Sequence, residues 1–145
     1  TWPAIWMLGN AIDKVGWPVC GEIDIMEHDG FDPDKIHCTV HTAAYNHVKG
    51  TQRGSTLDTK APFDGFHVYA TEWTEGAITF FFDDRVVFTF TKEGSGKDVW
   101  PFDAPHYLIL NLAIGGGWGG LKGVDEAIFP RRMLVDYVRV YRKHS

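Results

Sequence analysis

Short segments of this chain alternate or cluster apolar residues in the way that β-strands do. They are separated by turn-forming residues, and their pattern indicates strands rather than helices. The predicted strands are Ala4 to Leu8, Glu22 to Glu27, His37 to His41, His67 to Trp73, Ala77 to Phe82, Arg85 to Phe90, Tyr107 to Ala113 and Met133 to Arg142. Many short strands of this kind predict an all-β fold, most simply a β-sandwich.

Turn signals divide these strands without dividing the chain into domains. Asp83 and Asp84 interrupt the run ITFFFDDRVVFTF and predict a hairpin. The stretches 49–65 and 91–105 are polar and rich in Gly, Pro and Thr, so we predict loops there. No repeat, low-complexity tract or linker is present, which predicts one domain over residues 1–145.

Composition narrows the class of partner. The chain has 145 residues, of which 44% are apolar and 14% aromatic, enough for one hydrophobic core. Its formal charge of −5 gives no basic patch that would favour nucleic acid or an anionic membrane, and no apolar run approaches a membrane span. A neutral polysaccharide is compatible with this balance.

The segment GEIDIMEHDG carries three carboxyl groups on one predicted strand. Alternation puts Glu22 and Asp24 on one face and Glu27 on the other, unless a one-residue bulge at Met26 swings Glu27 back. With that bulge, inward-leaning side chains would bring the two glutamate carboxyls to roughly 5 Å, the spacing of a retaining glycosidase. We interpret Glu22 as nucleophile and Glu27 as acid/base. Asp24 is interpreted as a group that shares a proton or hydrogen bond with Glu22 and favours a retained proton on its neighbour. The bare pattern also fits an ordinary strand with a solvated polar face.

A family resemblance adds to this interpretation. GEIDIMEH, together with TWPAIWMLG, TVHT, FHVYATEWT, ITFFFDD, LILNLAIGGGWGG and VDYVRVYR, resembles glycoside hydrolase family 16, and within it the laminarinase-like endo-β-1,3-glucanases. The likeness runs from Trp2 to Arg142 in the family's order. It implies a jelly roll of the concanavalin A-like type with a substrate cleft on the concave sheet. It also assigns Glu22, Asp24 and Glu27 the same three roles.

The resemblance also bears on the chain's extent and surroundings. TWPAIWMLG opens inside a predicted strand, whereas the family's domain usually has strands upstream. We therefore expect a catalytic domain that is incomplete at its N-terminus and that separate N-terminal strands would complete. A polymer substrate implies an extracellular or periplasmic location.

Aromatic and polar side chains are candidates for sugar binding, since pyranose rings stack on aromatic faces while their hydroxyls need hydrogen-bond partners. Trp2 and Trp6 fall on one strand face, in a segment that the resemblance places in the cleft; the alternative is that they fill the core. Trp118 lies in GGGWGG, which suggests a loop at the cleft edge. His41 either binds sugar or a carboxylate, or is structural. Asn111 either ties strands together or binds a sugar hydroxyl.

Other residues are assigned less directly. Trp73 is expected in the core, whereas Trp17 and Trp100 stay unassigned. Cys20 and Cys38 form either a disulfide or two buried thiols. No zinc site is expected, and no cofactor is required. Many relatives bind a structural calcium, which would use Asp136; the alternative is a plain surface carboxylate.

The leading expectation is an endo-acting retaining hydrolase of β-1,3-glucan, as in laminarin, or of mixed-linkage β-glucan. A marine galactan hydrolase of the same fold is one alternative. A non-catalytic β-glucan-recognition module is the other, but such modules usually lose one or both glutamates. Since this chain retains Glu22, Asp24 and Glu27, the enzyme is favoured.

Overall fold

The computed structural model describes residues 1–94 and 96–142. Within them the chain forms eight strands and three short helical turns. These are β1 (Trp2–Gly9), α1 (Ile12–Val15), β2 (Glu22–Glu27), β3 (Lys35–His41), η1 (His47–Lys49), β4 (Arg53–Asp58), β5 (Tyr69–Trp73), β6 (Ala77–Phe82), β7 (Arg85–Thr91), β8 (His106–Ala113) and η2 (Glu126–Ile128).

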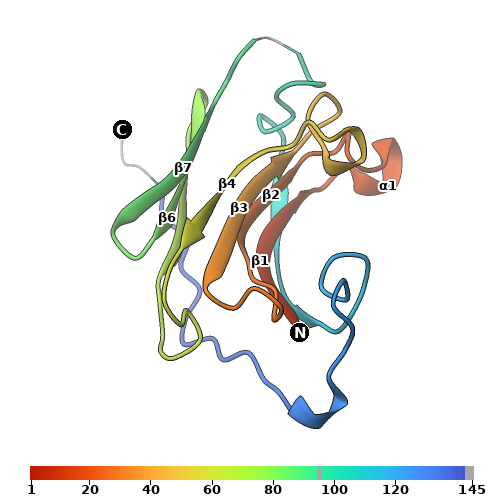
Figure 1. Cartoon of the computed structure of the whole chain (residues 1–145). Helices are drawn as coiled ribbons and strands as arrows, with labels where there is room; N and C mark the ends of the chain where they lie inside the picture. The colour runs from red at the N-terminus through yellow and green to blue at the C-terminus, as the bar shows by residue number, and fades with distance from the viewer. Residues whose placement is uncertain (95, 143–145) are drawn as a thin grey trace.

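The strands form two layers, seen in Figure 1. One sheet has the order β4-β3-β2-β1-β8 and the other has the order β5-β6-β7, and neighbouring strands are antiparallel throughout. Asp83 and Asp84 connect β6 to β7, which confirms the predicted hairpin. The prediction of an all-β sandwich is confirmed.

The core lies between the two sheets. Ile23 and Val40 of the larger sheet and Ile78 and Phe80 of the smaller sheet have no exposed surface. The buried cluster contains Ile23, Ile25, Cys38, Val40, Ile78, Phe80, Phe90, Trp100 and Phe102. Because side chains alternate along a strand, burying Ile23 directs its neighbours Glu22 and Asp24 to the opposite face of the sheet.

The predicted bulge in β2 is present, but its details differ from the prediction. Asp24 pairs with Thr39 and Glu27 with His37, so Ile25 and Met26 together lie opposite one residue of β3. On the other side, Ile5 pairs with Met26 and Trp6 with Asp24, which leaves Ile25 without a partner on β1. The extra residue is therefore Ile25 rather than Met26. The consequence for Glu27 is the one expected, because the bulge restores it to the face of Glu22.

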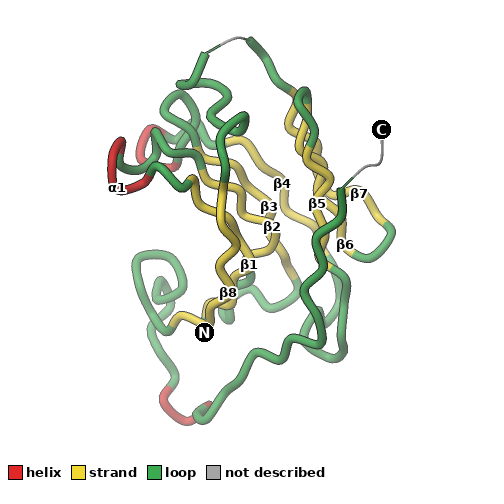
Figure 2. The backbone as a smooth tube through the Cα atoms, turned by 180° about the vertical axis from the view of Figure 1, so that it is seen from behind, coloured by secondary structure: helices red, strands yellow, loops and turns green. Residues whose placement is uncertain are grey.

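Two element predictions were wrong. The predicted loop at 49–65 contains β4, which pairs with β3 from Lys35↔Asp58 to Val40↔Arg53. As the edge strand, β4 is largely exposed, so its polar sequence RGSTLD has no apolar alternation to reveal it. Conversely, residues 133–142 form no strand, and Figure 2 draws them as loop. Their sequence suits a strand, but no strand of the described residues pairs with them.

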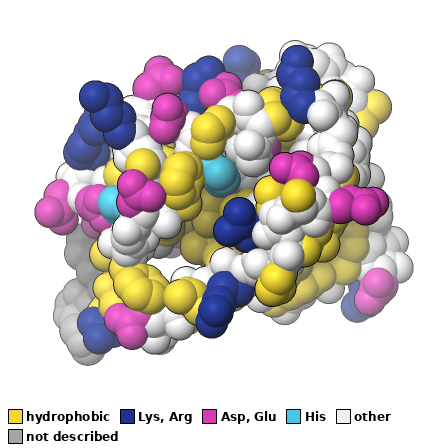
Figure 3. All heavy atoms as spheres, turned by 60° about the horizontal axis from the view of Figure 1, so that its bottom comes forward, with side chains coloured by type: hydrophobic (Ala, Val, Ile, Leu, Met, Phe, Trp, Pro, Cys, Tyr) yellow, Lys and Arg dark blue, Asp and Glu magenta, His cyan; other side chains and the backbone are white. Residues whose placement is uncertain are grey.

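Apolar side chains remain exposed on parts of the surface. They include Phe63, Phe66, Leu121, Leu134, Val140 and Tyr141. Figure 3 shows apolar side chains gathered in and around a hollow on one face of the molecule. Contiguous exposed apolar surface is typical of a region that contacts another surface.

Cys20 and Cys38 are both buried and both free, so the disulfide alternative is not realised in the structure. The Cys38 thiol donates to the Ile25 carbonyl at 3.2 Å, inside the bulge. Among the described helices, none has the length and apolar character needed to cross a membrane.

Candidate active site

The three carboxyl groups of β2 lie on the face of the five-stranded sheet that points away from the core. On β3, His41 pairs with Glu22 and His37 pairs with Glu27. On β1, Ala4 pairs with Glu27. Directly paired residues share a sheet face, so both histidines belong to the same surface as the glutamates.

Glu22 begins β2 and has two aromatic neighbours. Trp17 Nε1 donates to Glu22 Oε2 at 2.8 Å, and His41 Nε2 lies 3.8 Å from Oε1. Burial raises the pKa of Glu22, while its hydrogen bonds with Trp17 and Asp24 lower it. These bonds favour the ionised form that a nucleophile requires.

The residue before Glu22 fixes where the strand starts. Gly21 has φ +83°, and a Cβ there would lie 2.7 Å from Pro101 Cγ. Only glycine adopts this φ readily, and only glycine leaves room for the proline. The conformation of Gly21 therefore places Glu22 next to Trp17.

Asp24 lies between the two glutamates and is 2% exposed. Burial and the charges of Glu22 and Glu27 raise its pKa well above the ordinary value, as does its hydrogen bond with Glu22. Since its Oδ2 is buried without a hydrogen-bond partner, a carboxylate there would be costly. Asp24 therefore favours the protonated form and can share its proton with Glu22.

Glu27 ends β2 in a different environment. Trp2 Nε1 donates to Glu27 Oε1 at 3.1 Å. The pKa of Glu27 is raised to about 7, mainly by burial and also by the charges of Glu22 and Asp29, against the hydrogen bond from Trp2, which lowers it. A carboxyl group of this kind holds a proton that it can give up near neutral pH.

His41 carries no charge at neutral pH. Burial, with a smaller contribution from His47, lowers its pKa to about 4. Its Nε2 is 3.4 Å from Asp24 Oδ2, and its ring centroid lies 5.2 Å from that of His47 and 5.7 Å from that of Trp17. His41 therefore contributes a neutral donor beside two carboxyl groups.

The other predicted binding residues take different positions around the carboxyl groups. Trp118 meets Trp2 edge to face, with centroids 5.4 Å apart, so the glycine-rich loop reaches the Glu27 end. Trp6 Nε1 donates to Asn111 Oδ1 at 2.7 Å, which ties β1 to β8. Trp2 and Trp6 are only partly buried and lie outside the core cluster, so they do not fill the core.

The sequence interpretation missed Trp17, whose indole is bonded to Glu22. It lies in the turn before β2, where strand alternation gives no information about direction. Trp73, expected in the core, is 36% exposed, whereas Trp100 is buried. Trp73 lies at the end of the edge strand β5, which explains why a large apolar residue there is not covered.

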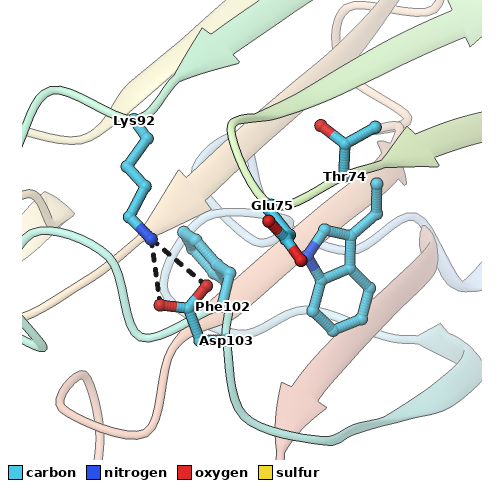
Figure 4. Close-up of a pocket in the computed structure, with 6 residues that line it drawn as sticks. Thr74, Glu75, Lys92, Phe102 and Asp103 are labelled. Carbon is cyan, nitrogen blue, oxygen red and sulfur yellow. Dashed lines mark hydrogen bonds and ion pairs between the residues drawn. The ribbon is translucent and has the colours of Figure 1, made fainter.

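Two cavities differ in their relation to the carboxyl groups. A cavity of about 370 Å³ is lined by Trp17, Pro18, Val19, Ala43, Asn46, Val48 and Lys49, and so adjoins the Glu22 end. A larger one, about 500 Å³, lies beside the β5–β6 turn and contains none of the three carboxyl groups. Figure 4 shows its lining residues Thr74, Glu75, Phe102 and the ion pair of Lys92 with Asp103. The smaller cavity is therefore the better candidate for part of an active site, because it adjoins Glu22.

The described residues contain one group of three side chains close enough to hold a metal ion. It consists of Glu22, Asp24 and His41, whose candidate atoms lie within 4.8 Å of one another. A buried set with one imidazole does not provide the six to eight oxygens that calcium prefers. The exposed Asp136 is not part of it, so the predicted calcium ligand stays a prediction.

Comparison with known proteins shows the family to which this chain belongs. Residues 1–139 match the family model for glycosyl hydrolases family 16. The chain belongs to this family. It is 52% identical to a beta-glucanase from Rhodothermus marinus, over 98% of this chain and 52% of that protein. It is 40% identical to a keratan-sulfate endo-1,4-beta-galactosidase from Sphingobacterium multivorum, over 98% of this chain and 33% of that protein.

A solved structure shows the same family fold. The laminarinase from Rhodothermus marinus superimposes with a TM-score of 0.84 at 49% identity, covering 89% of this chain and 54% of that one. This match supports the fold class predicted from the sequence. The chain spans about half the length of these glucanase relatives.

Proposed function

We propose that this family 16 domain hydrolyses β-1,3-glucan internally with retention of anomeric configuration. The observation that carries the proposal is the pair of glutamates on one sheet face, each bonded to a different indole. Burial raises the pKa of both, but hydrogen bonds with Trp17 and Asp24 favour the ionised form of Glu22, whereas Glu27 holds a proton near pH 7. A retaining glycosidase needs these two opposite states.

In the first step the Glu22 carboxylate attacks the anomeric carbon and forms a glycosyl ester. The bond from that carbon to the leaving oxygen breaks, and the proton of Glu27 passes to this oxygen. Asp24 remains protonated and hydrogen-bonded to Glu22, so it limits charge repulsion among three carboxyl groups without reacting.

In the second step Glu27, now ionised, removes a proton from water. The water oxygen attacks the anomeric carbon, and Glu22 leaves as a carboxylate. His41, neutral and close to both Glu22 and Asp24, can donate to a sugar hydroxyl or to a carboxylate.

The aromatic side chains suit a polymer that crosses the sheet face. Trp2 and Trp118 line the Glu27 end, and Trp17 lies at the Glu22 end beside the 370 Å³ cavity. We assign sugar stacking to these rings and hydroxyl contacts to Asn111, whose partner Trp6 holds it in place. Names of relatives support a glucan, since the matches include glucan endo-1,3-beta-glucosidases.

The test is reducing-sugar release and product sizing on laminarin, mixed-linkage β-glucan, agarose and carrageenan. It is run on this chain and on a version extended at its N-terminus, because the relatives are about twice as long. Short β-1,3-oligosaccharides from laminarin are expected. Reducing sugar released only from agarose or carrageenan would show that the substrate is a galactan rather than a glucan. Glucan binding without release by either version would instead favour a recognition module, such as the related beta-1,3-glucan-binding protein of Penaeus monodon.

The proposal also includes where the protein acts and which further strands complete its domain. A polymer substrate supports an extracellular or periplasmic site of action. Residues 133–142 expose apolar side chains that further strands would cover.

A further inference from the structure

The turn after β2 carries a fourth carboxyl group near Glu27. His28 N donates to Pro3 O at 3.1 Å, so the chain continues beside β1 after the strand ends. The carboxyl group of Asp29 lies on the side of Glu27, since its Oδ2 is 3.6 Å from Nε2 of His37, the cross-strand partner of Glu27. Asp29 is 1% exposed, which is rare for a carboxylate.

One hydrogen bond holds Asp29 in this position, and one imidazole lies close to it. The amide of Asp32 donates to Asp29 Oδ1 at 3.0 Å, and His37 Nε2 lies 3.6 Å from Oδ2. His37 is the cross-strand partner of Glu27. Asp29, His37 and Glu27 therefore form one cluster at the end of β2.

The imidazole of His37 is fixed as well. Its Nδ1 is 3.0 Å from Thr56 Oγ1 on β4, and its ring meets Trp118 at 4.9 Å between centroids. Its Nε2 is buried without a hydrogen-bond partner. Burial lowers the pKa of His37, which leaves the ring neutral at neutral pH.

A neutral His37 cannot cancel the charge of Asp29. Lys35, the first residue of β3, is hydrogen-bonded to Asp32 at 2.7 Å, and the charge of Asp29 is only the last of the causes that raise the lysine's pKa. The negative charge of Asp29 therefore acts on Glu27 in surroundings that screen it poorly. Burial remains the main cause of the raised pKa of Glu27, with Glu22 and Asp29 adding to it.

We propose that Asp29, held by the Asp32 amide and lying beside His37, is a positioning residue that acts through Glu27 and keeps its carboxyl group protonated. The catalytic consequence rests on the proposed function, but the effect on Glu27 does not require turnover. Charged and titratable groups around this cluster are Glu22 and Asp24 on β2, His28 and Asp32 in the turn, Lys35, His37 and His41 on β3, and the amino group of Thr1 near Gly30. From β1 and β8 the facing side chains are Trp2, Trp6 and Asn111, which do not titrate in this range.

The experiment titrates Glu27 directly. The chain is labelled with 13C at glutamate side-chain carboxyls, and the Glu27 signal is assigned by its loss in Glu27→Gln. In Asp29→Asn, which keeps the oxygen that accepts from the Asp32 amide, the Glu27 titration should move to lower pH by about half a unit or more. The alkaline limb of kcat/KM should move in the same direction. Asp32→Asn is the matched control, since that side chain is 40% exposed and paired with Lys35.

Each outcome bears on the proposal. An unchanged Glu27 titration in folded Asp29→Asn would overturn it. Asp29→Ser, which also keeps an acceptor oxygen without the charge, is the second variant, and failure of both to fold would show a structural residue and overturn it too. A shifted titration in a chain that hydrolyses no glucan would leave this inference standing and remove the proposed function. Glucan hydrolysis with an unchanged Glu27 titration in Asp29→Asn would overturn this inference and leave the proposed function standing.

Discussion

Replacing Trp17 with Phe removes the indole donor of Glu22 and leaves an aromatic ring in its place. The bond is 2.8 Å long and reaches Oε2, while His41 lies 3.8 Å from the other oxygen. Since this bond lowers the pKa of Glu22, its loss should raise that pKa. Less of Glu22 would then be ionised at a given acidic pH.

The size of the effect follows from the kind of bond. A hydrogen bond to a charged group contributes about 1.5 to 3 kcal/mol, and one pKa unit corresponds to about 1.4 kcal/mol. The Glu22 side chain is 17% exposed, so water replaces part of the lost bond. We therefore expect the acid limb of kcat/KM to move up by about one pH unit, the lower end of this range.

The assay is the pH profile of kcat/KM on soluble laminarin or an aryl β-glucoside oligomer. Trp6→Phe is the matched control, because its indole donates to the neutral Asn111 amide rather than to a carboxylate. That variant should leave the acid limb in place. An acid limb that stays unmoved in Trp17→Phe, or that moves equally in both variants, would refute the assignment of Glu22 as the group whose ionisation is required.

Three further predictions concern the two glutamates. Glu22→Gln should lose turnover by at least about a thousandfold while keeping the fold and glucan affinity, measured by circular dichroism and affinity electrophoresis; equal loss of affinity would argue against a nucleophile. Glu27→Ala should retain the first step on substrates with a good leaving group, and added azide should restore turnover and give a β-glycosyl azide detectable by mass spectrometry; absence of both would remove Glu27 as acid/base. The raised pKa of Glu27, about 7, means that the folded state binds the proton more tightly than the unfolded state. Its contribution to stability is complete below about pH 4.5 and is lost as pH rises to about 7, at most about 3 kcal/mol, so urea unfolding should show a steeper loss over this window in the parent chain than in Glu27→Gln.

Strand periodicity predicted most of the fold because the buried faces are apolar. The run EIDIME alternates from Glu22 to Ile25, which predicts β2 and the shared face of Glu22 and Asp24, whereas Glu27 joins that face only through the bulge. The edge strand β4 gave no such signal, since neither of its faces is extensively buried. Residues 133–142 show the converse, because an apolar sequence forms a strand only where a partner lies beside it.

The sequence predicted the candidate site residues that lie on regular strands and missed those that lie in turns. Side chains on regular strands, such as Glu22, Asp24 and His41, could be placed by counting residues. Trp17 and Asp29 could not, because both lie in turns whose direction depends on contacts with Glu22 and with His37. A bulge before Glu27 was expected, but at Met26; that Ile25 is the extra residue depends on the pairing with β1.

The most direct measurement of the central claim is the anomeric configuration of the first product. Laminarin hydrolysis is followed by 1H NMR within the first minutes, before mutarotation mixes the anomers, with the extended version used if the chain alone does not turn over. The account predicts that the β-anomer forms first, since Glu22 and Glu27 act in two successive displacements. Initial formation of the α-anomer would contradict it, because that result requires a single displacement by water.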